Sequence, residues 1–73
     1  MVKLTYDPEV DACYVAFVEM SPGISAQTLS IEPFAGALQV NADLDRNGNL
    51  VGLEFIGARE VFSEAVLARA SRD

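Results

Sequence analysis

The chain has 73 residues, 51% of them apolar and 22% charged, with a net charge of −6, which is the composition of one small folded domain spanning residues 1–73. One cysteine and no histidine exclude an internal disulfide, a zinc site built on Cys and His, and every catalytic triad or dyad that needs histidine. The five basic residues are scattered and no run of about 18 apolar residues occurs, so we expect a cytoplasmic protein without a nucleic-acid partner or a membrane span.

The first predicted element is a strand over residues 2–6, where apolar and polar side chains alternate. Pro8 ends it, because proline cannot donate to a strand ladder, and a turn follows through about Asp11. Residues 12–18 then form a continuous apolar run rich in β-branched and aromatic side chains, which is typical of a strand buried on both faces. We expect this second strand at the centre of a sheet.

Three further strands are predicted after the second one. Residues 24–31 alternate weakly after a Ser-Pro-Gly turn signal, which favours a third strand near an edge, and residues 32–36 break it with proline and glycine. Residues 37–44 alternate cleanly and predict a fourth strand. The turn sequence at residues 45–48, Asp-Arg-Asn-Gly, joins it to a fifth strand over residues 49–56 as a hairpin.

Gly52, inside the fifth strand, marks a bulge or a close approach by another backbone.

The end of the chain predicts a helix. Gly57 then permits a change of direction, and residues 58–70 repeat apolar side chains at helical spacing. The predicted fold is therefore α+β, an antiparallel sheet of four to five strands in hairpins with one C-terminal helix packed on one face.

The second strand predicts apolar surface on both sides of this sheet. Its odd-numbered residues, Cys13 to Phe17, lie on one side, and Tyr14 and Ala16 lie on the other. One helix covers one face, and large exposed apolar patches are rare on monomers. We infer that the second face meets another subunit or a partner, which would also supplement the small stability of a domain of this size.

Two segments resemble a known family. They are KLTYDPEVDACYV at residues 3–15 and VNADLDRNGNLVGLEFIGA at residues 40–58. Together they resemble the DUF2283 family of small prokaryotic proteins, over residues 2–58. The resemblance implies a compact strand-rich domain. It implies no catalytic residue and no cofactor, because the family has no assigned function. This chain departs from the family pattern at Cys13, in its proline-containing loops and in a longer predicted C-terminal helix.

The acidic hairpin also satisfies the spacing of an EF-hand calcium loop, with Asp43, Asp45, Asn47, Gly48 and Glu54 at the required positions. A calcium loop of this kind functions between two helices, whereas the residues on both sides of this one alternate with the period of a strand. The pattern and the resemblance favour a hairpin. A calcium-binding protein, through a loop from Asp43 to Glu54, is the alternative function.

Three other groups of side chains could carry chemistry. Three carboxylates lie in the first turn, at Asp7, Glu9 and Asp11. They favour a solvated turn in which Asp7 accepts from the following amides. Cys13 lies in an apolar strand without a nearby basic residue, so we expect a buried hydrophobe rather than a reactive thiol. Tyr6 and Tyr14 are expected to pack in the core, with partners for their hydroxyl groups.

No pair of residues has a spacing that predicts an active site, so we expect no enzyme activity. An acidic surface and an uncovered apolar face predict a non-enzymatic protein-interaction module, with a homodimer as the first expectation. By analogy alone, a small basic protein such as the toxin of a toxin–antitoxin pair is a further candidate partner.

Overall fold

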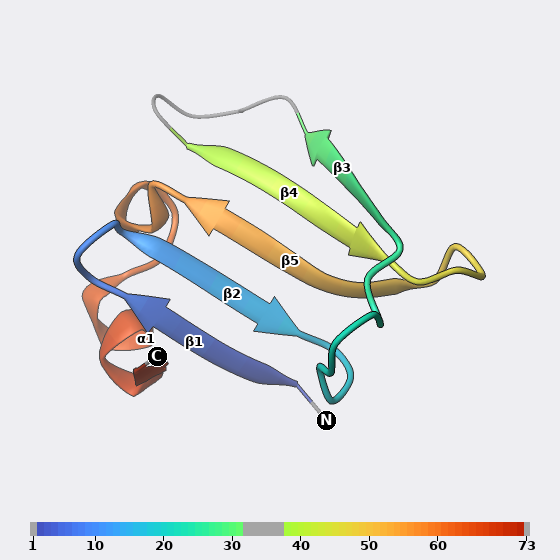
Figure 1. The fold of residues 1–73 in the computed structure, drawn as a ribbon. Helices are drawn as coiled ribbons and strands as arrows, with labels where there is room; N and C mark the ends of the chain where they lie inside the picture. The colour runs from blue at the N-terminus through green and yellow to red at the C-terminus, as the bar shows by residue number, and fades with distance from the viewer. Residues whose placement is uncertain (1, 32–37, 73) are drawn as a thin grey trace.

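The computed structural model describes residues 2–31 and 38–72. These residues form a mixed sheet, a 3-10 turn and a short helix, so the α+β class is correct in broad terms (Figure 1). The elements in chain order are β1 (Lys3–Asp7), β2 (Ala12–Ala16), β3 (Gln27–Ile31), β4 (Gln39–Leu44), β5 (Leu50–Ile56), η1 (Ala58–Glu60), α1 (Glu64–Arg69) and β6 (Ser71–Arg72). The predicted break at residues 32–36 lies outside the described residues.

The sheet has six strands in the order β3-β4-β5-β2-β1-β6. As predicted, β2 lies inside the sheet and β3 lies at an edge. The predicted count of four to five strands is wrong, because the chain returns after α1 and pairs β6 with β1 in parallel, Ser71 opposite Thr5 and Arg72 opposite Tyr6. A strand of two residues is too short to leave a periodic pattern in the sequence.

The predicted continuous helix over residues 58–70 is also wrong. Ser63 has an extended backbone (φ −70°, ψ 160°), and its hydroxyl accepts a hydrogen bond from the amide of Val66 at 3.3 Å. Ser63 is therefore the N-cap of a new helix, α1, which is separate from η1. Ala70 is extended again (φ −70°, ψ 147°), so α1 ends after six residues.

The predicted hairpin between β4 and β5 is confirmed. The amide of Asp45 donates to the carbonyl of Asn49 at 2.9 Å, and the amide of Gly48 donates to the carbonyl of Asp45 at 2.9 Å. Gly48 has a φ of 82°, a left-handed conformation that glycine adopts without steric cost. The tight turn and the left-handed glycine expected at residues 45–48 are therefore both present.

One face of the sheet, called the helix face below, is apolar at its paired positions. Directly opposed residues share a face. One row across the strands is Tyr6, Cys13, Phe55, Val40 and Ile31, and the next is Leu4, Val15, Leu53, Ala42 and Leu29. Ala58 of η1 and Leu67 of α1 form a buried cluster with the β1 and β2 end of these rows. Phe62 adds an edge-to-face contact with Phe55, ring centroids 5.0 Å apart.

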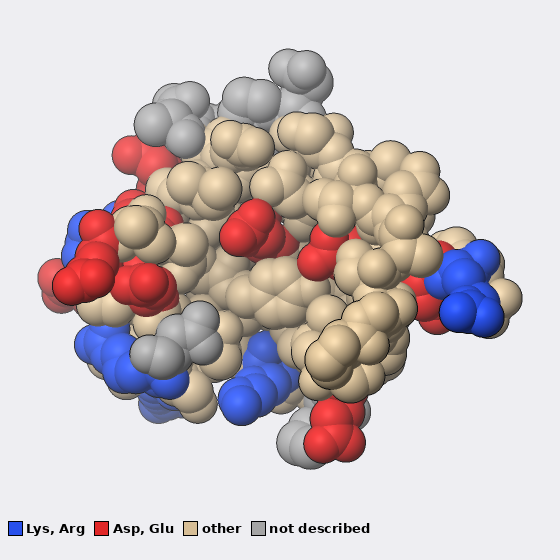
Figure 2. Space-filling model, viewed as in Figure 1, with Lys and Arg blue, Asp and Glu red and all other residues tan. Residues whose placement is uncertain are grey.

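The opposite face, called the Tyr14 face below, is largely polar. Two of its rows are Thr5, Tyr14, Glu54, Asn41 and Ser30, and Lys3, Ala16, Gly52, Asp43 and Thr28, and a third is Asp7, Ala12, Ile56 and Gln39. The expectation of a second apolar face is therefore wrong, because most of the side chains that the other strands place on this side are polar. Figure 2 shows acidic side chains over the middle of the sheet, and the rows place them on the Tyr14 face.

Candidate functional site

The most connected side chains of the Tyr14 face meet at Asp43. The hydroxyl of Tyr14 donates to Oδ2 of Asp43 at 2.7 Å, and the hydroxyl of Thr28 donates to Oδ1 at 2.7 Å. One carboxylate of β4 therefore joins side chains of β2 and β3. Both donors are neutral hydroxyls, so the negative charge of Asp43 is hydrogen-bonded but not neutralised.

Gly52 makes room for this arrangement. A Cβ atom at this position would overlap the Oη and Cζ atoms of Tyr14 and lie 2.8 Å from its Cε2 atom, so the tyrosine ring lies directly over the glycine. The pairing of β4 with β5 shifts register between Asp43 and Leu44, which confirms the bulge predicted near Gly52. The close approach expected there comes from the side chain of Tyr14 and not from another backbone.

Glu54 lies directly across from Tyr14, and its carboxylate accepts from the side-chain amide of Asn41 at 3.1 Å. Burial raises the pKa of the Tyr14 hydroxyl above its ordinary value, and the hydrogen bond to Asp43 and the charges of Asp43 and Glu54 raise that pKa further. Tyr14 therefore keeps its proton at neutral pH and acts as a donor. It is half-buried on the polar face, so its predicted place in the core is wrong, whereas Tyr6 is buried as predicted.

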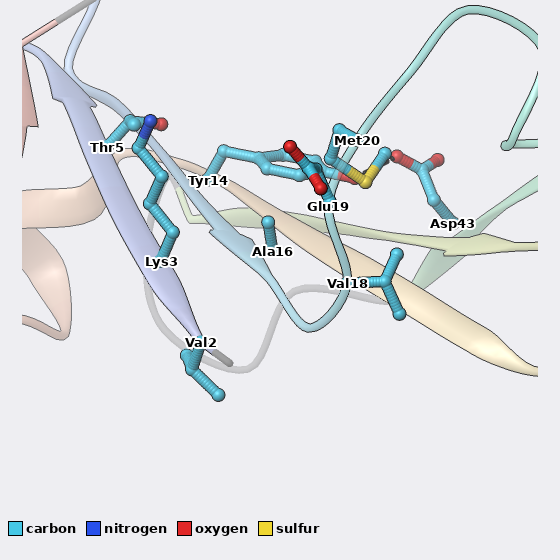
Figure 3. A pocket seen from close by; sticks show the side chains of 9 residues that line it. All are labelled: Val2, Lys3, Thr5, Tyr14, Ala16, Val18, Glu19, Met20 and Asp43. Carbon is cyan, nitrogen blue, oxygen red and sulfur yellow. Dashed lines mark hydrogen bonds between the residues drawn. The ribbon is translucent and has the colours of Figure 1, made fainter.

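A hollow of about 1000 Å³ opens to solvent on the Tyr14 face (Figure 3). Its lining combines polar and charged groups with exposed apolar side chains, namely Val2, Lys3, Thr5, Tyr14, Ala16, Val18, Glu19, Met20 and Asp43. Three of them, Val18, Glu19 and Met20, come from the connection that follows β2. No local pattern in the sequence predicts this site, because its members become neighbours only through the order of the strands.

The carboxylates of the first turn have two different structural roles. Oδ1 of Asp7 accepts from the amide of Glu9 at 3.0 Å, which confirms the predicted turn. Asp11 instead joins this turn to η1. Its carboxylate accepts from the hydroxyl of Tyr6 at 2.7 Å and from the amide of Arg59 at 3.3 Å, and its carbonyl accepts from the amides of residues 57 and 58 at 3.0 Å.

A second hollow, of about 590 Å³, lies beside the first turn, η1 and α1. Arg59 and Arg72 line it, and the guanidinium carbon of Arg72 lies 5.8 Å from the centre of the Tyr6 ring. Burial raises the pKa of Tyr6, and the hydrogen bond to Asp11 raises it further, while the charge of Arg59 opposes this. Two acidic side chains are also present here: Asp11, which accepts from Tyr6, and Glu64, which lines the hollow together with the two arginines.

The residues of the calcium-loop pattern are not brought together as calcium ligands. Oδ1 of Asp45 accepts from the amides of Asn47 and Asn49, both at 2.9 Å, and stabilises the turn. The Asn49 amide has the largest effect in lowering the pKa of Asp45. Asp43 and Glu54 are bonded on the Tyr14 face. Within residues 2–31 and 38–72, no three Asp, Glu, Cys or His side chains are grouped to hold a metal ion.

Cys13 is a buried hydrophobe, as predicted. It is 1% exposed, lies in the core cluster, and has a thiol pKa raised by burial. A buried thiol with a raised pKa forms little thiolate at neutral pH, so this cysteine is not poised as a nucleophile.

Comparison with known proteins gives a family and little else. No curated protein and no solved structure matches this chain significantly. The helices in the described part of the chain fall short of the length and apolar character that a membrane crossing needs. A family model described as a protein of unknown function matches residues 3–59, which covers both segments of the resemblance. The chain therefore belongs to the DUF2283 family.

Proposed function

We propose that this protein is a non-enzymatic, cytoplasmic interaction module that self-associates, with β3 of one copy pairing to β3 of a second copy. The observation that carries the proposal is the open edge at β3. All five residues of this strand are exposed, and among residues 2–31 and 38–72 it pairs with β4 alone. A small basic partner protein stays a prediction from analogy.

The chemistry of this edge favours pairing. Proteins protect edge strands by charge, by proline or by shortness, because the free backbone groups bind other strands. The other edge of the sheet is so protected, since β6 has two residues and one of them is Arg72. In contrast, β3 has the uncharged sequence QTLSI. Residues 20–31 carry no charge in a chain of net charge −6, so repulsion between two copies is smallest here.

The helix face also continues to this edge, where no described segment covers it. Leu29 and Ile31 belong to the apolar rows and are 44% and 42% exposed. The helical segments lie away from β3, toward the opposite edge of the sheet and near the end of β1 (Figure 1). Antiparallel pairing centred on Leu29 would place it against its own counterpart, so the apolar face would run on into the second copy.

The nucleophiles of the described residues support the non-enzymatic part of the proposal. The Cys13 thiol is buried with a raised pKa, and Tyr14 holds its proton in a hydrogen bond to Asp43. The sequence contains no histidine to activate a hydroxyl or a thiol.

The test is the molar mass in solution. We expect light scattering at micromolar concentration to give twice the mass of the chain, and Leu29→Lys to give the single mass, because it places two positive charges together at the symmetry axis. Leu50→Lys is the matched control, since Leu50 is 43% exposed and lies outside β3. A wild-type monomer would refute the proposal, and so would equal effects of the two lysines.

A covalent variant tests the register separately. Residues directly opposed in an antiparallel pair have Cα atoms roughly 4.5–5.5 Å apart, within the reach of a disulfide. Leu29→Cys should therefore form an oxidised dimer rapidly, whereas Leu50→Cys should not. Cys13 does not interfere, because it is 1% exposed. Equal cross-linking of both variants would show random collision instead of pairing.

A further inference from the structure

We propose that the hollow on the Tyr14 face binds an organic cation, an ammonium or guanidinium group carried on a hydrocarbon stem. The ring of Tyr14 lies in this hollow, β1 contributes Lys3 to its wall, and the connection after β2 contributes Glu19 and Met20 (Figure 3). The proposal goes beyond self-association and does not depend on it, because β3 lends no side chain to the lining of the hollow.

The aromatic ring supplies the first element of recognition. Tyr14 lies over Gly52 with the hydroxyl end of its ring, and it also lines the hollow. Cations bind to the face of an aromatic ring, where the electron density of the π system lies. The hydroxyl of the ring donates to the carboxylate of Asp43 at 2.7 Å, and this bond polarises the ring toward greater electron density.

The charges around the ring supply the second element. Asp43 and Glu19 line the hollow, and Glu54 lies directly across from Tyr14. Lys3 is the basic side chain in the lining, so the carboxylates outnumber it. Asp43 accepts from neutral hydroxyl groups, and the whole chain carries a net charge of −6. The site therefore attracts positive charge both locally and at long range.

The apolar side chains around the charges select the kind of cation. Val2, Val18 and Met20 line the same hollow and are exposed, which suits a hydrocarbon stem beside a charged end. A metal ion would need several oxygen ligands converging on one point, and the described residues contain no group of three carboxylates so placed. The combination of ring, carboxylates and apolar rim fits an alkylammonium or alkylguanidinium group.

The test is an amide NMR titration with butylguanidinium and butylammonium, with butylurea as the neutral analogue of the same shape. We expect saturable shifts at Tyr14, Met20 and Asp43 with both cations, weaker binding in added salt, and no such shifts with butylurea. Equal binding of butylurea would overturn the proposal. A short arginine peptide distinguishes the sources: tighter binding than butylguanidinium assigns the cation to a protein side chain, and equal binding assigns it to a free small molecule.

Variants separate local recognition from net charge. Asp43→Asn and Glu60→Gln each remove one negative charge, but Glu60 lies in η1, away from the hollow. We expect Asp43→Asn to weaken binding about two- to fivefold and Glu60→Gln to leave it unchanged. If Asp43→Asn perturbs the sheet, Glu19→Gln, outside every strand, replaces it. Lys3→Gln should tighten binding by removing a competing charge, and weaker binding of both cations in that variant would show that charge attraction does not govern the site.

Discussion

The ring of Tyr14 occupies the space that a side chain at position 52 would fill. The glycine lies on β5 and the tyrosine on the neighbouring strand β2, one diagonal step away in the ladder, since Ala16 is the direct partner of Gly52. The missing side chain lets the tyrosine cross β5 and reach Asp43 on β4 with its hydroxyl. The polar network of this face therefore depends on one glycine.

Gly52→Ala should destabilise the fold. The added methyl group would overlap the ring of Tyr14. The ring must therefore move, and its hydrogen bond to Asp43 must weaken. We expect the free energy of unfolding to fall by about 1–3 kcal/mol, measured by urea denaturation.

The same substitution in a Tyr14→Ala background is the control. Without the ring, the alanine at position 52 has nothing to displace, so its cost should vanish and a coupling energy of about 1 kcal/mol or more should appear in the double-mutant cycle. Additive effects of the two substitutions would show that the ring does not depend on the glycine.

The two tyrosines should resist ionisation in the native protein. Burial raises the pKa of both Tyr6 and Tyr14, and each hydroxyl donates to a carboxylate. We expect the folded chain to show less tyrosinate absorbance at pH 10 than the chain in urea, where the tyrosines are half-ionised near the ordinary value of 10.0. Because the native pKa is raised, the stabilisation is complete below pH 10 and is lost as the pH rises through the native pKa. Equal tyrosinate absorbance at pH 10 in the folded chain and in the chain in urea would contradict this assignment.

The parts of the fold that could be predicted from the sequence are those whose causes are local. The turn at residues 45–48 was predictable because Asp45 and Gly48 supply the side-chain acceptor and the left-handed backbone that it needs. The strands β1 and β4 were predictable because the alternation of apolar and polar side chains is itself a local pattern. A glycine inside a strand predicts a bulge, and the register shift beside Gly52 confirms it.

The parts that could not be predicted depend on the order of the strands. Tyr14 and Asp43 are 29 residues apart, and no local pattern places them on the same face within reach of each other. The apolar run of β2 predicted two apolar faces, but the character of the Tyr14 face is decided by Glu54 and Asn41 on neighbouring strands. The short β6 and the interruption of the helix at Ser63 likewise depend on where the chain returns.

Calcium should not bind to the hairpin. The pattern from Asp43 to Glu54 resembles a calcium loop, but Asp45 is committed to the turn amides, and Asp43 and Glu54 hold separate partners on the Tyr14 face. Isothermal titration with millimolar calcium should give the heat of dilution alone, with no change in the unfolding midpoint. A saturable heat that Asp45→Asn abolishes would restore the alternative function.

The hairpin should weaken in acid through Asp45. The amides of Asn49 and Asn47 lower the pKa of Asp45 from its ordinary value of 3.8, so the native state favours the ionised carboxylate. This stabilisation is present above pH 3.8 and is lost as the pH falls through the lowered native value. The stability difference between wild type and Asp45→Asn should therefore shrink below pH 3.8, as followed by urea denaturation at several pH values. A difference that stays constant down to acid pH would show that the charge is unimportant.

Asp11 should be the most sensitive position of the first turn. It has a φ of 55°, which few residues other than glycine, asparagine and aspartate adopt, and its carboxylate caps η1 from a segment 48 residues away. Asp11→Ala removes the acceptor for Tyr6 and Arg59 and strains the backbone, so we expect a loss of about 1–3 kcal/mol in the free energy of unfolding.

Three companion variants divide this loss into its causes. Asp11→Gly relieves the backbone but lacks the acceptor, and Asp11→Asn keeps an acceptor and tolerates the positive φ, so asparagine should cost least. Glu9→Ala is the control within the same turn, because Glu9 is exposed and its hydrogen bond to Asp7 uses the backbone amide. If Asp11→Ala costs no more than Glu9→Ala in urea denaturation, the link between the first turn and η1 contributes nothing to stability. If Asp11→Gly is as stable as wild type, backbone strain alone explains the loss caused by Asp11→Ala, and the hydrogen bonds of the carboxylate contribute nothing.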